Sequence, residues 1–189
     1  MKGIYKGNIV LLGPPGAGKG TVAESLVDSH GYVLISTGDI LREEKKSGSE
    51  IGKKIVDLIG KGNLVPDELI FEIIEKKVSE SEGPFLIDGT PRTIPQGEFL
   101  EKKVDVGLVL FIDVSDKTTM ERIKTRGKTS RREDDQDPKI AEKRLDQYKR
   151  ETLPLVDFYK EMGKVVSIDG EKSPSDVMKQ IENVLNLWK

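Results

Sequence analysis

The sequence predicts an α/β fold in which helices flank a parallel sheet of about five strands. Short, continuously apolar runs recur along the chain, and segments with the apolar spacing of helices lie between them. Runs that are apolar on both faces are typical of the buried strands of a parallel sheet. The expected strands are Asn8–Leu12, Tyr32–Ile35, Pro84–Ile87, Val106–Val114 and Lys164–Ile168.

Helices are expected where apolar residues recur every three or four positions. Two such faces are formed by Val22, Leu26 and Val27 and by Leu69, Ile70, Ile73, Ile74 and Val78. The last helix has the clearest face, which is formed by Val177, Ile181, Val184, Leu185 and Trp188. Ser173 and Pro174 mark its beginning, because serine caps a helix and proline fits the first turn.

Two segments do not follow this alternation of strand and helix. Ser36–Val65 contains a glycine-punctuated helical stretch, and its expected apolar face is formed by Ile51, Ile55, Leu58 and Ile59. Thr125–Asp135 is strongly charged and almost free of apolar residues. We interpret both as insertions into a single domain over residues 1–189, because no linker or repeat separates two cores.

The composition excludes several classes of protein. The 31 basic and 33 acidic residues give a net charge of −2, which excludes a globally basic nucleic-acid or membrane-surface binder. The absence of cysteine excludes disulfides, thiolate metal sites and cysteine nucleophiles. No apolar run is long enough to span a bilayer, and the first residues lack the apolar core of a signal peptide. A cytoplasmic enzyme without nucleic-acid or membrane partners is therefore expected.

A glycine-rich loop follows the first strand and precedes a helix. It reads Gly13-Pro14-Pro15-Gly16-Ala17-Gly18-Lys19-Gly20-Thr21, which contains the phosphate-binding pattern G-x4-G-K. The glycines allow consecutive backbone N–H groups to turn inward, while the helix N-terminus and Lys19 add positive charge. The motif predicts nucleotide binding without specifying the reaction.

Two aspartates at the ends of expected strands are candidates for binding magnesium. Asp88 directly follows the third strand, and Asp113 lies near the end of the fourth. A carboxylate at the carboxyl end of a parallel strand, beside a phosphate loop, can hold the water shell of Mg²⁺. We expect Asp88 to take this role, with Asp113 as the competing candidate.

The other charged residues favour phosphoryl transfer over a regulatory GTPase. The guanine-reading sequence Asn-Lys-x-Asp is absent, and the chain instead carries arginines in two segments: Arg122, Arg126, Arg131, Arg132 and Arg144. Phosphoryl transfer needs such cations, because the protein mainly aligns the reactants and neutralises charge on the transferred oxygens. An ionised phosphate acceptor needs no general base, and the only histidine, His30, is expected to be structural or solvated.

Taken together, these motifs resemble the adenylate kinase family. The phosphate loop matches the family, including Gly20 after the lysine. Further matches occur in family order at Ile35–Arg42, Gly62–Glu68, Phe85–Gln96, Arg122–Gly127, Arg132–Gln136 and Lys143–Leu145. The resemblance implies a P-loop three-layer fold and a monomeric kinase with Mg²⁺ as cofactor and no zinc. Its reaction would be reversible transfer of a phosphoryl group from ATP to AMP, giving two ADP.

The resemblance also implies which residues bind the nucleotides. Those for ATP are Gly16, Ala17, Gly18, Lys19, Gly20, Thr21, Arg122, Arg126 and Lys172. Those for AMP are Thr37, Arg42, Asn63, Leu64, Val65, Gly89, Thr90, Pro91, Arg92, Gln96, Arg132 and Arg144. Catalysis would depend on Lys19, Arg92, Arg126, Arg132 and Arg144. Ser36–Val65 would close over AMP, and Thr125–Asp135 would form a short lid over ATP.

Two alternative functions stay open at this point. The first is a UMP/CMP or broad-specificity nucleoside monophosphate kinase, although such relatives usually carry alanine for Thr37 and asparagine for Thr93. The second is a nucleotide-binding switch without turnover. The chain departs from the family at Thr90, where an aromatic or aliphatic residue is usual, and has one extra residue near Asp137-Pro138.

Overall fold

The computed structural model describes residues 4–47, 55, 63–129 and 135–188. Its strands form a five-stranded sheet in the order β2-β3-β1-β4-β5, and every neighbouring pair is parallel. They are β1 (Asn8–Leu12), β2 (Val33–Ser36), β3 (Phe85–Asp88), β4 (Val106–Asp113) and β5 (Val165–Asp169). The predicted fold class is confirmed, and every strand boundary lies within one residue of the expected position.

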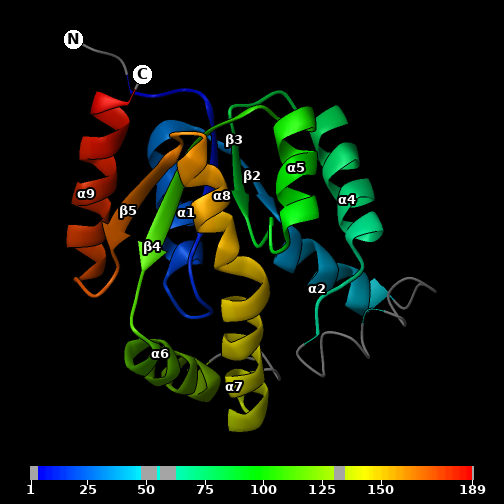
Figure 1. The fold of residues 1–189 in the computed structure, drawn as a ribbon, viewed down its shortest axis with the longest axis vertical. Coiled ribbons are helices and arrows are strands. Elements are labelled where there is room, and N and C mark those ends of the chain that lie inside the picture. Colours follow the sequence, from blue (N-terminus) through cyan, green and yellow to red (C-terminus); the bar gives the residue numbers. More distant parts are fainter. Residues whose placement is uncertain (1–3, 48–54, 56–62, 130–134, 189) are drawn as a thin grey trace.

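Helices pack on both faces of this sheet (Figure 1). The helices with described bounds are α1 (Lys19–His30), α2 (Thr37–Ser47), α4 (Asp67–Ser79), α5 (Ile94–Lys103), α6 (Asp116–Thr129), α7 (Pro138–Gln147), α8 (Pro154–Glu161) and α9 (Pro174–Leu187). A π-helical turn, η2 (Tyr148–Thr152), joins α7 to α8. The apolar faces predicted for α1, α4 and α9 all contribute buried residues to the core.

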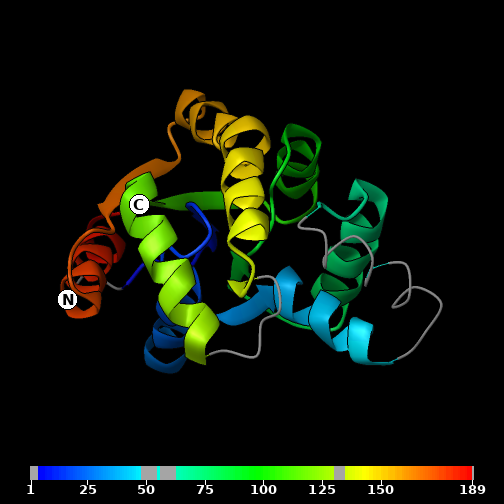
Figure 2. The ribbon, with the colours of Figure 1, turned by 90° about the horizontal axis from the view of Figure 1, so that it is seen from below.

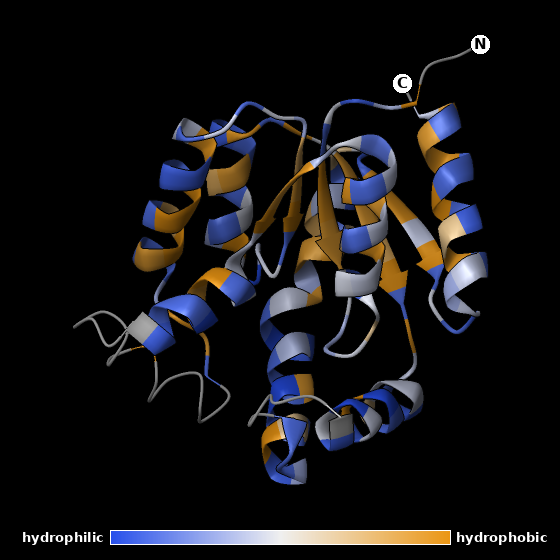
Figure 3. Ribbon diagram, turned by 180° about the vertical axis from the view of Figure 1, so that it is seen from behind, coloured by the Kyte–Doolittle hydropathy of each residue, from blue (hydrophilic) through white to orange (hydrophobic). Residues whose placement is uncertain are grey.

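The core consists of two apolar clusters, one on each face of the sheet. Ile9 and Leu11 of β1 pack with α1 and α9 on one face. Val10 and Leu12 belong to the cluster on the other face, with residues of α2, α4, α5 and α8. Because successive side chains of a strand point to opposite faces, the central strand β1 serves both clusters. Figure 3 shows the result, with apolar strands enclosed by helices whose outer surfaces are polar.

The carboxyl ends of the strands meet at one edge of the sheet. In the strand register, Asp88 lies beside Leu11 on one side and Ser36 on the other. The loop after β1 and the start of α1 therefore lie near Asp88. α2, α6 and α7 extend from the same end of the sheet, as the views from the side and from below show (Figures 1 and 2).

Side-chain caps fix where several helices begin. The Ser173 hydroxyl accepts a hydrogen bond from the backbone N–H of Asp176 at 3.2 Å, which confirms the predicted start of α9. The Asp137 carboxylate likewise accepts from the N–H of Lys139 at 2.9 Å, so α7 begins at Pro138. His30 is the last residue of α1, and its ring lies 2.7 Å from the Glu182 carboxylate, which ties α1 to α9.

The two expected insertions are described in part. The first contributes α2 and Ile55, which is buried in the core cluster of α4 and α5. The second contributes the end of α6 and Asp135. Ile51, Leu58, Ile59, Arg131 and Arg132 lie outside the described residues. The bounds of the insertions stay a prediction. Within the described ranges, no helix has both the length and the apolar composition that a bilayer span requires.

Candidate active site

A cavity of about 580 Å³ opens at the carboxyl edge of the sheet. This volume suits a small-molecule ligand, because ligand pockets measure roughly 300–1,000 Å³. The cavity is lined by most of the predicted site residues: Gly16, Gly18, Lys19, Gly20, Thr21, Thr37, Arg42, Asn63, Leu64, Val65, Asp88, Gly89, Pro91, Arg92, Gln96, Arg122, Arg126 and Arg144. The fold thus brings together motifs that are far apart in the sequence.

Three other predicted residues are absent from the lining of this cavity. Ala17 is buried, and its carbonyl accepts a hydrogen bond from Arg122 Nη1 at 3.4 Å. Thr90 is buried and hydrogen-bonds to Gln96. Lys172 is exposed, with its Nζ 3.7 Å from the Asp169 carboxylate. Arg132 lies outside the described residues. The binding roles of all four stay predictions.

The glycine-rich loop places backbone N–H groups at the cavity. Gly16 has a φ of 83°, and a Cβ there would lie 3.2 Å from the carbonyl oxygen of Thr119, so a larger residue is disfavoured. α1 begins directly after the loop, and its N-cap Gly18 offers no side chain to accept from the first turn. The N–H groups and the positive end of the helix dipole are therefore suited to bind phosphate oxygens.

Lys19 folds back over the loop. Its ammonium donates hydrogen bonds to the carbonyl oxygens of Gly13 at 2.8 Å and Pro14 at 2.9 Å. Burial of the side chain is the main cause that lowers the pKa of Lys19 to about 8, while the Asp88 carboxylate acts in the opposite direction. Three arginines also lower this pKa by repulsion: Arg92, Arg144 and Arg126. The cavity therefore concentrates positive charge, which a bound polyphosphate would neutralise.

A buried carboxylate joins two of these arginines. Asp135 accepts hydrogen bonds from Arg126 Nε at 2.6 Å and Nη2 at 2.8 Å, and from Arg144 Nη1 at 2.9 Å. Its side chain is fully buried, whereas the arginines are partly exposed toward the cavity. Burial acts to raise the pKa of Asp135, but the hydrogen bonds and charges of Arg126 and Arg144 prevail and keep this pKa below its usual value.

Arg122 occupies the far side of the loop. Its Nη2 donates to the carbonyl oxygen of Gly170 at 2.8 Å, and its Nη1 reaches the carbonyl of Ala17. These contacts connect α6, the phosphate loop and the turn after β5. The guanidinium plane is thus held at the edge of the cavity, where it can stack on a planar ring.

Polar residues of β2 and α2 line another part of the cavity. Thr37 is buried at the start of α2, and its hydroxyl donates to the carbonyl of Asp88 at 3.4 Å. Arg42 pairs with Asp39 one turn earlier, and Asp39 also accepts from the Ser36 hydroxyl at 2.6 Å. Gly89 has a φ of 85°, and a Cβ there would lie 2.8 Å from Thr37 Oγ1. This close approach requires glycine at position 89.

Gln96 is anchored within a network at the start of α5. Its Oε1 accepts from Thr90 Oγ1 at 2.9 Å and from the backbone N–H of Arg92 at 2.7 Å. Its Nε2 donates to Asp67 Oδ1 at 2.6 Å, and Thr93 donates to the other oxygen of Asp67 at 3.1 Å. Arg92 Nε donates in turn to the carbonyl of Gly89 at 2.7 Å.

Asp88 is the better placed of the two magnesium candidates. It lines the cavity and is close enough to Lys19 to affect its pKa. Asp113 is exposed at the end of β4 and is absent from the cavity lining. The described residues contain no cluster of three or more side chains that could enclose a metal ion. One carboxylate suits Mg²⁺, which keeps most of its waters when it binds together with phosphates.

Sequence reasoning missed the residues that hold the site residues in place. Asp135, Asp67 and Thr152 were not singled out, although Thr152 donates to the carbonyl of Arg92 at 3.0 Å. For Arg144 a signal existed, because a cation on a partly apolar helix face needs a partner, and Asp135 is that partner. No local pattern in the sequence marked Asp135 as the acidic residue that pairs with Arg126 and Arg144.

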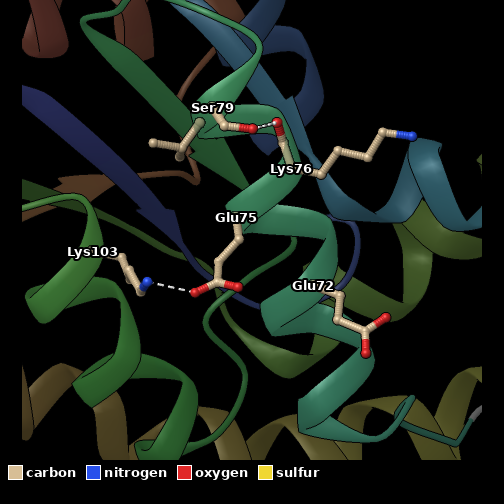
Figure 4. A pocket seen from close by; sticks show the side chains of 6 residues that line it. Glu72, Glu75, Lys76, Ser79 and Lys103 are labelled. Atoms are coloured by element: carbon tan, nitrogen blue, oxygen red, sulfur yellow. Dashed lines mark hydrogen bonds and ion pairs between the residues drawn. The ribbon is translucent and has the colours of Figure 1, made fainter.

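A second hollow of about 580 Å³ lies at α4 and α5, and none of the predicted site residues lines it. Figure 4 shows Glu72, Glu75, Lys76 and Ser79 along α4, with Lys103 of α5 opposite. Lys103 Nζ lies 2.5 Å from Glu75 Oε1, and Ser79 Oγ donates to the carbonyl of Lys76 at 2.8 Å. Because none of the predicted site residues lines this hollow and Lys103 is paired with Glu75, the cavity at the carboxyl edge is the better candidate site.

Comparison with known proteins agrees with this geometry. A family model described as adenylate kinase matches residues 11–164. An adenylate kinase of Methanosarcina barkeri is 38% identical over 94% of this chain and 98% of its own. One of Hyphomonas neptunium is 40% identical, with 94% and 97% of the two chains covered. Human adenylate kinase isoenzyme 1 is 41% identical, with 96% and 95% covered.

Proposed function

Because the chain belongs to the adenylate kinase family, we propose that it transfers the terminal phosphoryl group of ATP to AMP and forms two ADP. The observation that carries this proposal is the convergence of Lys19, Arg92, Arg126 and Arg144 on one cavity. These residues come from four separate segments, and their like charges favour an anionic ligand, although Asp135 pairs with Arg126 and Arg144 in the free protein. A chain of phosphates between two nucleotides supplies the matching negative charge.

The proposed reaction is a direct in-line transfer. The phosphate of AMP is already ionised at neutral pH, so the attacking oxygen needs no general base. The loop N–H groups and Lys19 would hold the transferred group, while Arg126 and Arg144 would neutralise charge on its oxygens. Arg122 would stack on the adenine of ATP and the backbone of Lys172 would contact this base, while Ala17 belongs to the loop that would wrap the ATP phosphates. Arg132, which lies outside the described residues, would assist on the acceptor side.

AMP would bind at the α2 and α5 side of the cavity. Arg42 and Arg92 would contact its phosphate, and Gln96 would read the edge of its base. The remaining residues of this side are Thr37, Asn63, Leu64, Val65, Gly89, Thr90 and Pro91, most of which line the cavity. Ser36–Val65 would close over AMP, and Thr125–Asp135 over ATP. Closure excludes water, which would otherwise accept the phosphoryl group.

Mg²⁺ would enter with ATP and neutralise charge on its phosphates. Asp88 would orient the waters of this ion from the end of β3. We also propose a cytoplasmic monomer with a role in nucleotide biosynthesis, without zinc and without nucleic-acid or membrane partners. The net charge of −2 supports the absence of nucleic-acid and membrane partners, and the lack of cysteine supports the absence of a thiolate zinc site.

The proposed function is tested by following nucleotides chromatographically with ATP and Mg²⁺ and with AMP, UMP or CMP in turn. We expect stoichiometric loss of ATP and AMP with formation of two ADP. Faster phosphorylation of UMP or CMP than of AMP would instead identify a kinase for pyrimidine monophosphates. Tight ATP binding without transfer to any of the three would identify a non-catalytic nucleotide-binding protein.

Replacement of Arg92 by alanine should weaken the use of AMP selectively. Loss of a charged hydrogen-bond donor to the phosphate should raise KM for AMP about tenfold or more, with KM for ATP within about twofold. The backbone contacts of Arg92 with Gln96 and Thr152 survive in the variant, so the fold should be kept.

Steady-state kinetics with each nucleotide varied separately measures this effect. Arg150→Ala is the matched control, because Arg150 is largely exposed and lies outside the cavity lining. An unchanged KM for AMP in Arg92→Ala, or an equal change in the control, contradicts the assigned role.

A further inference from the structure

The amide of Gln96 has an orientation that its partners fix without ambiguity. The N–H of Arg92 can only donate, so the atom 2.7 Å from it must be the amide oxygen. The carboxylate of Asp67 can only accept when ionised, so the atom 2.6 Å from it must be the amide nitrogen. Gln96 is 2% exposed and yet belongs to the cavity lining, so this orientation is set at the wall of the nucleotide site.

The hydrogen-bonding capacity of this amide is almost fully used inside the protein. An amide oxygen accepts two hydrogen bonds, and Thr90 and Arg92 supply both. The amide nitrogen donates two, and Asp67 takes one. Among the described residues, the capacity left on the amide of Gln96 is therefore a single N–H donor. Without the hydroxyl of Thr90, the amide oxygen would have an unused lone pair, and the amide would be held by one hydrogen bond fewer.

We infer that Thr90 is a positioning residue for base recognition, because its hydroxyl saturates the Gln96 carbonyl and makes this side chain a pure hydrogen-bond donor. The inference rests on the proposed function and adds to it how the base of the acceptor nucleotide, AMP, is recognised. A base that binds against Gln96 must bring a hydrogen-bond acceptor. N1 and N7, the ring acceptors of adenine on the side away from the ribose, meet this need, whereas an N–H at the same place would face another donor.

The structure also explains why a hydroxyl is required at this position. Thr90 is 1% exposed, so water cannot replace its hydroxyl as a partner of the amide oxygen. Valine has nearly the same shape but no hydroxyl, and serine keeps the hydroxyl but lacks the methyl group. In Thr90→Val, the oxygen still accepts from the N–H of Arg92, so no buried polar atom of Gln96 is left without a partner. Comparison of Thr90→Val with Thr90→Ser therefore separates the effect of the lost hydrogen bond from the effect of changed packing.

The experiment measures kcat and KM for AMP, 1-deaza-AMP and 7-deaza-AMP with wild type, Thr90→Val and Thr90→Ser. Each deaza analogue replaces one ring nitrogen of adenine by C–H and so removes one acceptor. We expect wild type to bind one analogue more weakly than AMP. Thr90→Val should raise KM for AMP about threefold to tenfold, with KM for ATP and kcat within about twofold. Thr90→Ser should behave like wild type.

The decisive result is whether the effect of the Thr90 substitution on KM depends on which ring nitrogen the substrate carries. If Thr90 acts through the Gln96 donor, Thr90→Val should leave KM for the weakly bound analogue nearly unchanged, because the contact is already absent. Equal increases for AMP and both analogues would show a packing role and overturn the inference, as would equal losses in Thr90→Ser and Thr90→Val.

Two further outcomes keep the test independent of folding and of the proposed function. Thermal unfolding is measured for each variant, and Thr90→Ala replaces Thr90→Val if the latter is unfolded. Equal KM values of the wild type for AMP and both analogues overturn the inference without any variant. Wild type that fails to phosphorylate AMP refutes the proposed function instead.

Discussion

Replacement of Arg126 by alanine is expected to lower kcat at least about 100-fold, the usual effect of removing one donor to charge that develops in the transition state. Arg126 lines the cavity from α6 and lies close enough to Lys19 to lower its pKa. The variant should remain folded, because Asp135 keeps Arg144 as a partner at 2.9 Å. KM for AMP should change far less than kcat.

Single-turnover and steady-state rates measure this loss, with thermal unfolding as the check on folding. Lys124→Ala is the matched control, because Lys124 lies on the same helix, is exposed, and is absent from the cavity lining. Arg126→Lys should recover part of the rate, since it keeps the charge but not the two-pronged geometry. A decrease of less than about fivefold in Arg126→Ala would mean that Arg126 does not contact the transferred group.

Replacement of Lys19 by methionine should have the larger effect, a decrease in kcat of about 1,000-fold, because both a full charge and a hydrogen-bond donor are lost. Methionine keeps the unbranched shape of the side chain and removes the ammonium. The loop itself should persist, since glycine backbone geometry and the start of α1 define it. Loss of less than about tenfold would exclude Lys19 as the group that holds the transferred phosphate.

The same residue predicts how ATP binding depends on pH. In the free protein the pKa of Lys19 is about 8, so the side chain becomes neutral as the pH rises above that value. Bound phosphates favour the ammonium, so binding above pH 8 must take up a proton. Kd for ATP should therefore rise with pH above about 8, by at most about tenfold per pH unit, until the pKa of the complex is reached.

Calorimetric titrations between pH 7 and 9.5, in buffers of different ionisation enthalpy, measure both Kd and proton uptake. Lys19→Met is the control and should show neither the proton uptake nor this rise of Kd. A wild-type Kd that stays constant over the whole range would contradict the lowered pKa.

The strands and the phosphate loop could be predicted from the sequence because their signals are local. Continuous apolar runs define β1 to β5, and glycine spacing defines the loop. The helix start at Ser173 could also be predicted, since a cap acts on a residue only three positions away. The observed strand boundaries differ from the expected ones by one residue at most.

The supporting contacts of the site could not be predicted in this way. Arg126 meets Asp135 nine residues later, and Gln96 meets Asp67 29 residues earlier. Whether a carboxylate is solvated or buried depends on which distant segments pack against it in the folded chain, and no short sequence pattern encodes that packing. The family resemblance named the residues that would touch nucleotide, whereas Asp67 and Asp135 lay in matching segments without a role, and only the structure shows what they bind.

Asp135 acts as a counter-ion that the protein carries itself. An arriving phosphate has to compete with this carboxylate for the guanidinium groups of Arg126 and Arg144. The free energy gained on binding is then the difference between two ionic contacts and not the full value of one. The same competition lowers the affinity for the product ADP. Lower product affinity favours rapid release of ADP, which suits an enzyme whose reaction is reversible.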